Sequence, residues 1–167
     1  MFFLELESVF NTPGLAEPFG FAMPASYDAL PFAQPPAITG EVRNRAGVVS
    51  LQGTAQVQLS AQCDRCADEF ILNVAVPLQH TLVLSLNNEN TDDFVLLQSY
   101  RFNPCDLIWE DIVLAMPPRI LCQSDCAGLC NMCGANHNTT QCNCVAPQPE
   151  NIETIKPFAH LKDIDII

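Results

Sequence analysis

Hydrophobic and polar side chains alternate most regularly between Val49 and Ala61, where every second residue is apolar or small and the others are serine, glutamine or threonine. A strand with one buried and one exposed face has this period of two. Residues 70–86 repeat the alternation across a bend near Pro77. We therefore expect two long strands that pair antiparallel, with the sequence CDRC, residues 63–66, at the tip of their hairpin.

Shorter patterns predict the rest of the sheet. Residues 4–7 alternate and indicate a short strand near the N-terminus. Residues 38–45 should pair with the other side of the long strand through a turn at residues 43–47. The polar stretch 87–93 is typical of a loop, and residues 94–102 then predict a returning strand.

Residues 11–36 contain six prolines among scattered aromatic residues. Proline lacks the N–H that a strand ladder uses, so this stretch predicts an irregular arm laid across the core. Packing of its aromatic side chains should hold the arm in place, although the same side chains would also suit a partner-binding surface. These side chains are Phe19, Phe21, Tyr27 and Phe32.

After residue 102 the period becomes that of a helix. Asn103 is a good N-cap, Pro104 suits the first turn, and Asp106 complements the helix dipole. The pattern ends at two prolines, 117 and 118. Because the apolar residues follow one face, the helix should lie on the sheet. They are Leu107, Ile108, Ile112, Val113, Ala115 and Met116.

The length of the chain limits the number of domains, and its charge disfavours direct binding to nucleic acid. A chain of 167 residues supports one main domain with a small appended module. Seven Lys and Arg against nineteen Asp and Glu give a net charge of −12, spread along the chain, and such a surface repels phosphates. The local basic pair, Arg43 and Arg45, is more typical of a solvated turn than of an RNA contact.

The start of the chain lacks the basic segment and cleavage pattern of a signal peptide, and no apolar run approaches the roughly 20 residues of a membrane helix. We therefore expect a cytoplasmic protein. Thiols stay reduced there, and clustered cysteines bind metal more often than they form disulfides. The alternative, a secreted disulfide scaffold, fits poorly with an odd count of nine cysteines.

Zinc prefers four thiolate or imidazole ligands in a tetrahedron, usually supplied by two short pairs. Cys130 and Cys133 form one such pair, and Cys142 with Cys144 lies nearest along the chain, so these four predict a small zinc knuckle. His137, in the intervening loop, could replace one ligand, although a solvated loop histidine is the more common case.

A second zinc site is predicted from the cysteine pairs that remain. Cys63 and Cys66 lie at the hairpin tip, and Cys122 and Cys126 follow the helix that packs on the same sheet. Four thiolates from these pairs would clamp the helix exit to the hairpin. Cys105, in the first helical turn, is expected to be a buried or partly buried free thiol.

The sequence gives little support for catalysis. The three histidines, His80, His137 and His160, are scattered and show no nucleophile and base pattern. CDRC could be a redox dithiol, but such pairs usually open a helix, whereas this one lies between strands. No phosphate loop, dinucleotide fingerprint or carboxylate pair is found, so we expect neither an enzyme nor a small-molecule substrate.

Several segments together resemble the YceD family, the large ribosomal RNA subunit accumulation proteins. They are the strand ending in CDRC, the helix DLIWEDIVLAMP, the block LCQSDCAGLCNMCGANHN and the near-terminal PFAHL, which occur in the family's order over about residues 39–161. The resemblance implies a small non-enzymatic bacterial or organellar protein needed for synthesis, processing or stability of the large-subunit rRNA. The cysteine-rich block resembles the branch of the family that is able to bind metal.

The matching positions are Cys63, Cys66, Leu114, Ala115, Met116, Pro117, Cys126, Gly128, Leu129, Cys130, Cys133, Gly134 and Asn136, with Met116 in place of a leucine. Three positions depart from the family pattern: Ala127 replaces a common lysine, Asn131 a proline and His137 a leucine. Loss of the lysine removes a cation beside the cluster and weakens the case for direct RNA contact there.

We therefore expect an α+β fold with a twisted, mainly antiparallel sheet, open or partly closed into a barrel, and one main helix. Residues 1–120 should form the core domain, 121–145 the zinc module, and 146–167 a linker with an amphipathic tail. The expected function is scaffolding of ribosome assembly through a basic ribosomal or assembly protein, with rRNA contacted indirectly and no membrane. The alternatives are a zinc-stabilised interaction module of another pathway and a thiol redox enzyme.

Overall fold

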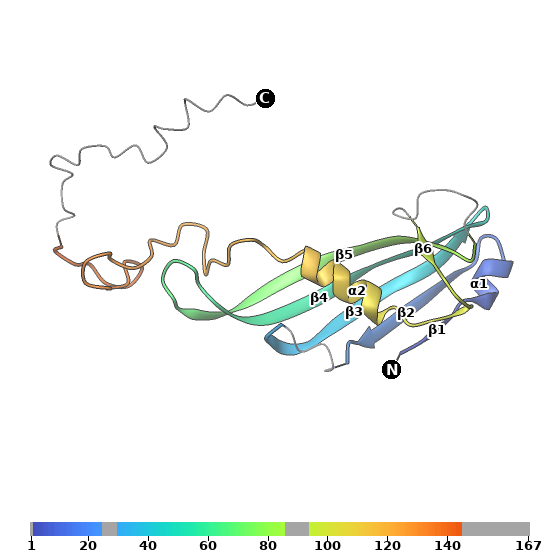
Figure 1. Cartoon of the computed structure of the whole chain (residues 1–167), viewed down its shortest axis with the longest axis horizontal. Coiled ribbons are helices and arrows are strands. Elements are labelled where there is room, and N and C mark those ends of the chain that lie inside the picture. The colour runs from blue at the N-terminus through green and yellow to red at the C-terminus, as the bar shows by residue number, and fades with distance from the viewer. Residues whose placement is uncertain (1, 25–29, 86–93, 145–167) are drawn as a thin grey trace, which may run out of the picture.

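The computed structural model describes residues 2–24, 30–85 and 94–144. Its elements run along the chain from β1 to α2 (Figure 1). They are β1 (Leu4–Glu5), α1 (Glu7–Asn11), β2 (Ala16–Ala22), β3 (Phe32–Arg45), β4 (Val48–Gln62), β5 (Glu69–Val83), β6 (Val95–Leu96), β7 (Arg101–Phe102) and α2 (Cys105–Leu114). The expected loop at 87–93, Tyr27 and the tail 146–167 lie outside the described residues.

The fold is mostly β, built on a five-stranded sheet with the order β2-β3-β4-β5-β6. Every pair is antiparallel except β5 with β6, so the sheet is mixed. The expectation of a partly closed barrel is wrong. In the described residues, β2 and β6 are the two edges of the sheet and do not pair with each other, so the sheet is open.

The long hairpin is confirmed. β4 pairs with β5 from Val49 opposite Leu82 to Gln62 opposite Glu69, which leaves CDRC at the tip. β3 pairs with the other side of β4 through Ala46 and Gly47. Both of these residues have positive φ, as a two-residue hairpin turn requires. The tip of the β4–β5 hairpin extends toward the cysteine-rich segment at the left of Figure 1.

The expectation of an irregular arm over residues 11–36 is wrong, because the described residues of this stretch include β2 and the start of β3. Its prolines occupy positions where a missing N–H costs little. Pro18 lies on the edge strand β2, and two more prolines fall where the register of β3 against β4 shifts between Gln34 and Ala37. Phe19, Phe21 and Phe32 pack against the core, as expected.

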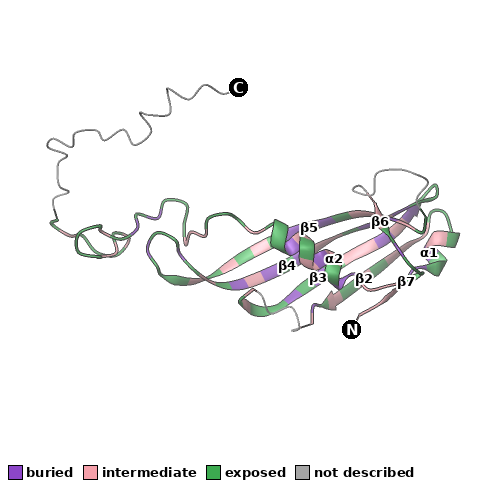
Figure 2. Cartoon of the chain, in the orientation of Figure 1, coloured by how far each residue is buried: buried purple, intermediate pink, exposed green. Residues whose placement is uncertain are grey.

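The core lies between one face of the sheet and the two helices. Buried positions alternate with exposed ones along the strands (Figure 2). The opposite face of β4 carries the polar residues of the alternating pattern. The largest fully buried side chains are Leu6, Met23, Ile38, Leu51, Leu82, Ile108 and Ile112. Burial of each of these side chains stabilises the folded state by about 1.5–3 kcal/mol relative to an exposed position.

Two glycines allow β3 and β4 to approach closely at the centre of the sheet. Gly40 is paired with Gly53. A Cβ on Gly40 would lie 2.3 Å from the carbonyl oxygen of Gln52 and 2.8 Å from the Phe19 ring. A Cβ on Gly53 would lie 2.5 Å from the carbonyl oxygen of Thr39. Only glycine fits both positions, and the space above Gly40 is filled by Phe19.

The predicted helix is confirmed as α2, which packs against β4 and β5. The N-cap residue of α2 is Pro104, one position after the expected Asn103, and the Cys105 N–H donates to Asn103 Oδ1 at 3.2 Å. His80 on β5 reaches Asp111 on α2, with 2.6 Å between Nε2 and Oδ2, and ties the helix to the sheet. The segment before α2 forms two short strands, β6 and β7, in place of the single expected strand.

The N-terminal strand is confirmed, but it is only two residues long and pairs with β7. The chain then enters α1 at Glu7. Among the helices of the described segments, none has both the length and the apolar character needed to cross a membrane.

Candidate metal centres

Eight of the nine cysteines gather in two groups of four, and the Sγ atoms of each group lie within 4.8 Å of one another. The first cluster is Cys63, Cys66, Cys122 and Cys126, and the second cluster is Cys130, Cys133, Cys142 and Cys144. These are the groups that the sequence predicts. The ninth, Cys105, is a buried free thiol, as expected.

The first cluster begins with the turn that closes the β4–β5 hairpin. The Cys63 N–H donates to the Asp68 carbonyl at 2.9 Å, and the Ala67 N–H donates to the Cys63 carbonyl at 2.9 Å. Ala67 takes the left-handed conformation with φ of 58°, which lets the chain reverse within the tip. This turn brings the Cys63 and Cys66 sulfurs to one side of the hairpin.

The segment that follows α2 then docks on this tip. Asp64 makes two hydrogen bonds with Ile120. Its N–H donates to the Ile120 carbonyl at 2.8 Å, and its Oδ2 accepts from the Ile120 N–H at 2.7 Å. The Arg65 guanidinium donates to the Cys126 carbonyl at 2.9 Å. These contacts deliver Cys122 and Cys126 to the hairpin cysteines.

Sulfur contacts close the first cluster. The Sγ atoms of Cys63 and Cys126 are 3.7 Å apart, and those of Cys66 and Cys122 are 3.6 Å apart. Cys63, Cys66 and Cys126 are at most 3 % exposed. The partly buried side chains packed around them include Phe70 and Leu121. The first cluster is therefore enclosed by protein.

The second cluster is built on a tighter loop. The Gly134 N–H donates to the Cys130 carbonyl at 2.9 Å, and the Cys130 N–H donates to the Ala135 carbonyl at 2.8 Å. Gly134 has φ of 72°, a conformation that glycine adopts without strain. The return loop brings up Cys142 and Cys144. Cys133 and Cys144 are exposed, so this cluster is open to solvent.

Each cluster contains one thiol that ionises readily. Burial opposes ionisation of Cys63, but backbone N–H groups of Cys122, Cys66 and Arg65 outweigh it and lower the pKa of Cys63 to about 6. In the second cluster, backbone N–H groups of Cys133 and Met132 lower the pKa of Cys130 to about 6. Both groups thus offer a thiolate at neutral pH.

Neighbouring thiols in the same clusters resist ionisation. Burial raises the pKa of Cys122. The side chain of Cys133, together with burial, raises the pKa of Cys144 to about 12. Four negative sulfurs cannot lie this close without a compensating cation. A bound cation would let these thiols ionise as well, and each group of four sulfurs could hold one metal ion.

The donor set and spacing fit a tetrahedral thiophilic ion. A tetrahedron with metal–sulfur distances near 2.3 Å places its sulfurs about 3.8 Å apart, close to the 3.6 and 3.7 Å found in the first cluster. Four cysteines fill all four positions, which is the pattern of a structural site. His137 lies beside the second cluster but is not a member of its four-sulfur group.

Sequence reasoning missed the polar residues Asp68 and Asn138 beside the clusters and assigned no contact to Asn136. The side chain of Asn138 contacts Cys126 Sγ at 3.3 Å, and Asn136 donates to Asp68 at 2.7 Å.

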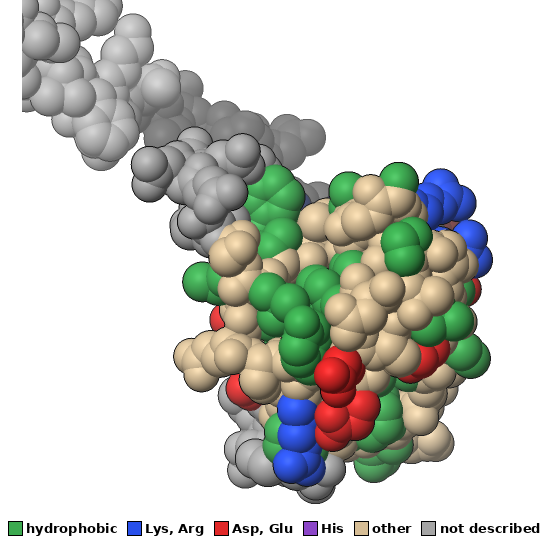
Figure 3. Space-filling view, turned by 90° about the vertical axis from the view of Figure 1, so that its right-hand side faces the viewer, with side chains coloured by type: hydrophobic (Ala, Val, Ile, Leu, Met, Phe, Trp, Pro, Cys, Tyr) green, Lys and Arg blue, Asp and Glu red, His purple; other side chains and the backbone are tan. Residues whose placement is uncertain are grey.

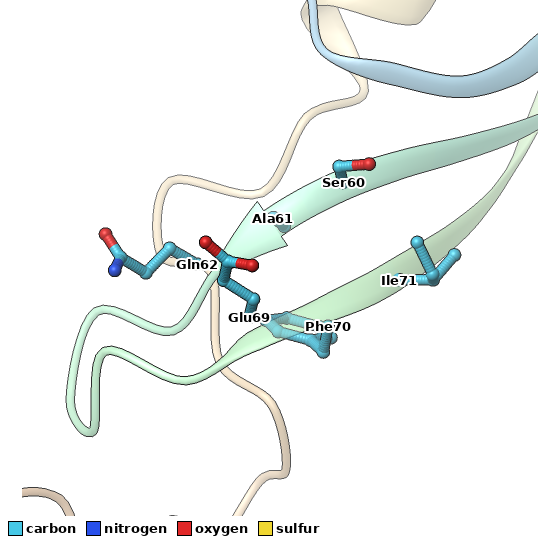
Figure 4. A pocket seen from close by; sticks show the side chains of 6 residues that line it. All are labelled: Ser60, Ala61, Gln62, Glu69, Phe70 and Ile71. Carbon is cyan, nitrogen blue, oxygen red and sulfur yellow. The ribbon is translucent and has the colours of Figure 1, made fainter.

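An open groove lies beside the first cluster, where the ends of β4 and β5 leave the body of the sheet (Figure 4). It has a volume of about 460 Å³, and its charged lining residue is Glu69. The lining residues are Ser60, Ala61, Gln62, Glu69, Phe70 and Ile71.

The fold and the clusters define a class: a small, mostly-β protein in which a long hairpin and the exit of a helix meet at one of two candidate structural metal centres. The chain belongs to the YceD family, since the family model described as large ribosomal RNA subunit accumulation protein YceD matches residues 51–165, well over half of the chain. This confirms the resemblance seen in the sequence. Comparison with curated proteins and with solved structures gave no match.

Proposed function

We propose that this protein supports accumulation of the large-subunit rRNA as a non-enzymatic scaffold whose recognition end is fixed by two zinc ions. Membership of the YceD family implies a role in large-subunit rRNA accumulation. The observation that carries the mechanism is the first cluster, in which two cysteines of a hairpin tip meet two from the segment after α2. Such a site joins parts of a fold and leaves no open position for a substrate.

Zinc is the proposed ion at both clusters. Four thiolates in a tetrahedral arrangement favour zinc over harder divalent cations, which prefer oxygen ligands. The ion would neutralise part of the sulfur charge and hold the module of residues 121–145 against the core. Native mass spectrometry of the reduced full chain should show two zinc ions. A chain that binds none under saturating zinc would contradict the structural role.

A basic ribosomal or assembly protein is the proposed partner. The chain carries a net charge of −12, and eight zinc-bound thiolates would make it more negative. At the end of the molecule away from the clusters, basic side chains lie beside acidic ones (Figure 3). Two arginines form ion pairs, with 2.9 Å between Arg43 Nε and Glu41 Oε1 and 3.3 Å between Arg101 Nε and Glu5 Oε1. A carboxylate beside each arginine also repels phosphate groups, which weakens these arginines as RNA contacts.

Two apolar side chains offer contact points for such a partner. Leu114 at the end of α2 is 83 % exposed, and Met132 in the second cluster's loop is 62 % exposed. Exposed apolar side chains on an acidic surface suit a protein with both basic and apolar groups. A salt titration on purified large-subunit rRNA tests the alternative. Tight binding that weakens steeply with salt would mean several direct phosphate contacts and would overturn the indirect mechanism.

Cellular rRNA levels provide the direct test. Cys63→Ser with Cys66→Ser should lower the ratio of large-subunit to small-subunit rRNA in the protein's own cells, because the hairpin loses its zinc. Cys105→Ala is the matched control, since this cysteine belongs to neither cluster. The proposal fails if cells lacking the whole chain keep a normal ratio.

A thiol redox role is the second candidate, because the pKa of Cys63 is lowered to about 6 in a Cys-x-x-Cys pair. Its 3 % exposure and its position among four sulfurs favour the structural role. The two roles differ in alkylation rate. A structural site predicts slow labelling of Cys63 and Cys66 in the zinc-loaded chain and fast labelling after chelation, whereas a redox dithiol predicts fast labelling throughout.

A further inference from the structure

The two clusters share a hydrogen-bond network that neither needs for its own four sulfurs. Asn138 lies in the return loop of the second cluster, yet its Nδ2 approaches Cys126 Sγ of the first cluster at 3.3 Å. The same Nδ2 donates to Asn136 Oδ1 at 2.8 Å. Asn138 Oδ1 accepts from the Ala127 N–H at 2.8 Å. The loop of the second cluster therefore holds both Cys126 and the residue after it.

Asn136 extends the network to the hairpin. Its Nδ2 donates to Asp68 Oδ2 at 2.7 Å, across 68 positions of the chain. Its backbone carbonyl accepts from the N–H groups of Thr139 and Thr140 and so shapes the loop that leads to Cys142. Asn136 thus contacts the hairpin turn beside the first cluster and also shapes the loop that leads to the ligands of the second cluster.

Backbone bonds make the connection stiff. The Leu129 N–H donates to the Arg65 carbonyl at 3.1 Å, and Leu129 pairs with Asn136 in an antiparallel bridge. Leu129 immediately precedes Cys130, the first ligand of the second cluster. One short piece of chain is therefore bonded to the hairpin tip on one side and carries a ligand of the other cluster.

We propose that the two metal sites load cooperatively, with Asn138 and Asn136 as the positioning residues that couple them. The inference rests on zinc binding as proposed above. An ion in the second cluster fixes the loop that presents the Asn138 N–H to Cys126, and an N–H···S bond stabilises a metal-bound thiolate. Because coupling is reciprocal, an ion in the first cluster favours the second site to the same extent.

A thermodynamic cycle on the reduced full chain tests this. The overall constant for binding two Zn²⁺ ions is measured by chelator competition and native mass spectrometry. The single-site constants come from Cys63→Ser/Cys66→Ser and from Cys142→Ser/Cys144→Ser. We expect the overall constant to exceed the product of the single-site constants by about tenfold, a typical effect of hydrogen bonds to metal ligands. A ratio of one would mean independent sites and would overturn the inference.

Variants of the intact chain provide a test that does not depend on folding of the cysteine mutants. Asn138→Asp keeps an acceptor for the Ala127 N–H but loses the N–H donors to Cys126 and Asn136. It should raise the fraction of singly loaded chain at half saturation, whereas Asn131→Ala, at an exposed position between Cys130 and Cys133, should not. An unchanged fraction in Asn138→Asp contradicts the coupling role.

Failure of the inference can be told apart from failure of the proposed function. Two ions that bind with a ratio of one leave the zinc scaffold standing and remove only the coupling. A chain that binds no zinc removes both.

Discussion

Gly128 lies directly against Arg65, so that a Cβ at position 128 would be 3.1 Å from the Arg65 carbonyl oxygen. Gly128 also has φ of 76°, where side chains are strained. This contact lies between the two clusters, at the point where the cysteine-rich segment meets the hairpin tip. It is the tightest approach that the glycines of this segment make.

Gly128→Ala should therefore loosen the docking of the segment. We expect a loss of about 2 kcal/mol from the left-handed conformation and the close contact together. Gly134→Ala is the matched control, because Gly134 has φ of 72° but no atom within 4 Å of the added Cβ. Thermal unfolding of the zinc-loaded chain should show a larger fall in Tm for Gly128→Ala. Equal shifts would mean that contact with Arg65 is unimportant.

Zinc binding should release protons in a pH-dependent number. Folding lowers the pKa of Cys63 and Cys130 from 9.0 to about 6, so both are ionised at pH 7 and protonated at pH 5. Binding at pH 7 should release fewer than four protons per ion, and the number should rise toward four below pH 6 while affinity falls. Calorimetry in buffers of different ionisation enthalpy measures it. A number independent of pH would contradict the lowered values.

The same shift affects the metal-free protein. A pKa lowered on folding contributes stability in full above the unfolded value of 9.0 and loses it as the pH falls through about 6. The free energy of unfolding of the metal-free chain should therefore decline as the pH falls from 9 to 6. Serine at both positions should remove that part of the decline.

The glycine pair at the centre of the sheet should be intolerant of substitution. Gly53→Ala places a Cβ 2.5 Å from the Thr39 carbonyl oxygen, a contact with backbone that cannot move aside. We expect a loss of about 3 kcal/mol in urea unfolding. Gly20→Ala, in the edge strand β2, meets its nearest atom at 3.7 Å and should change stability by less than about 0.5 kcal/mol. Similar losses for both would contradict the crowding at Gly53.

Substitution of a buried asparagine should destabilise the protein as much as a substitution in the apolar core. Asn44 is 1 % exposed, and its Nδ2 donates to the carbonyls of Val9 and Phe10 at the end of α1. Asn44→Asp removes this donor and leaves a buried carboxylate facing carbonyl oxygens. We expect a loss of at least about 3 kcal/mol in urea unfolding. Asn73→Asp, on the exposed face of β5, should be nearly neutral. A small effect at position 44 would show that α1 does not depend on this cap.

Sequence reasoning succeeded where a simple period or spacing carries the information. The two-residue period of Val49 to Ala61 predicted β4, because only one face of that strand is buried. The cysteine groups followed from the short spacing within each pair and from the hairpin that lifts Cys63 and Cys66 to the helix exit.

It failed where the cost of a residue depends on its neighbours in space. Pro18 does not prevent a strand, because β2 is an edge and needs no donor there. Arg43 and Arg45 were interpreted as a solvated turn, but Asn44 between them is buried, and its amide donates to carbonyls 34 and 35 positions away. The contact of Asn138 with Cys126 likewise joins two clusters that spacing treats as separate.

The β4–β5 hairpin also sets a distance. β4 has 15 residues, and at about 3.3 Å per residue an extended strand of that length measures about 50 Å. One of its ends is the Ala46–Gly47 turn and the other carries the first cluster. Two molecules bound at the opposite ends of the hairpin would therefore lie about 50 Å apart.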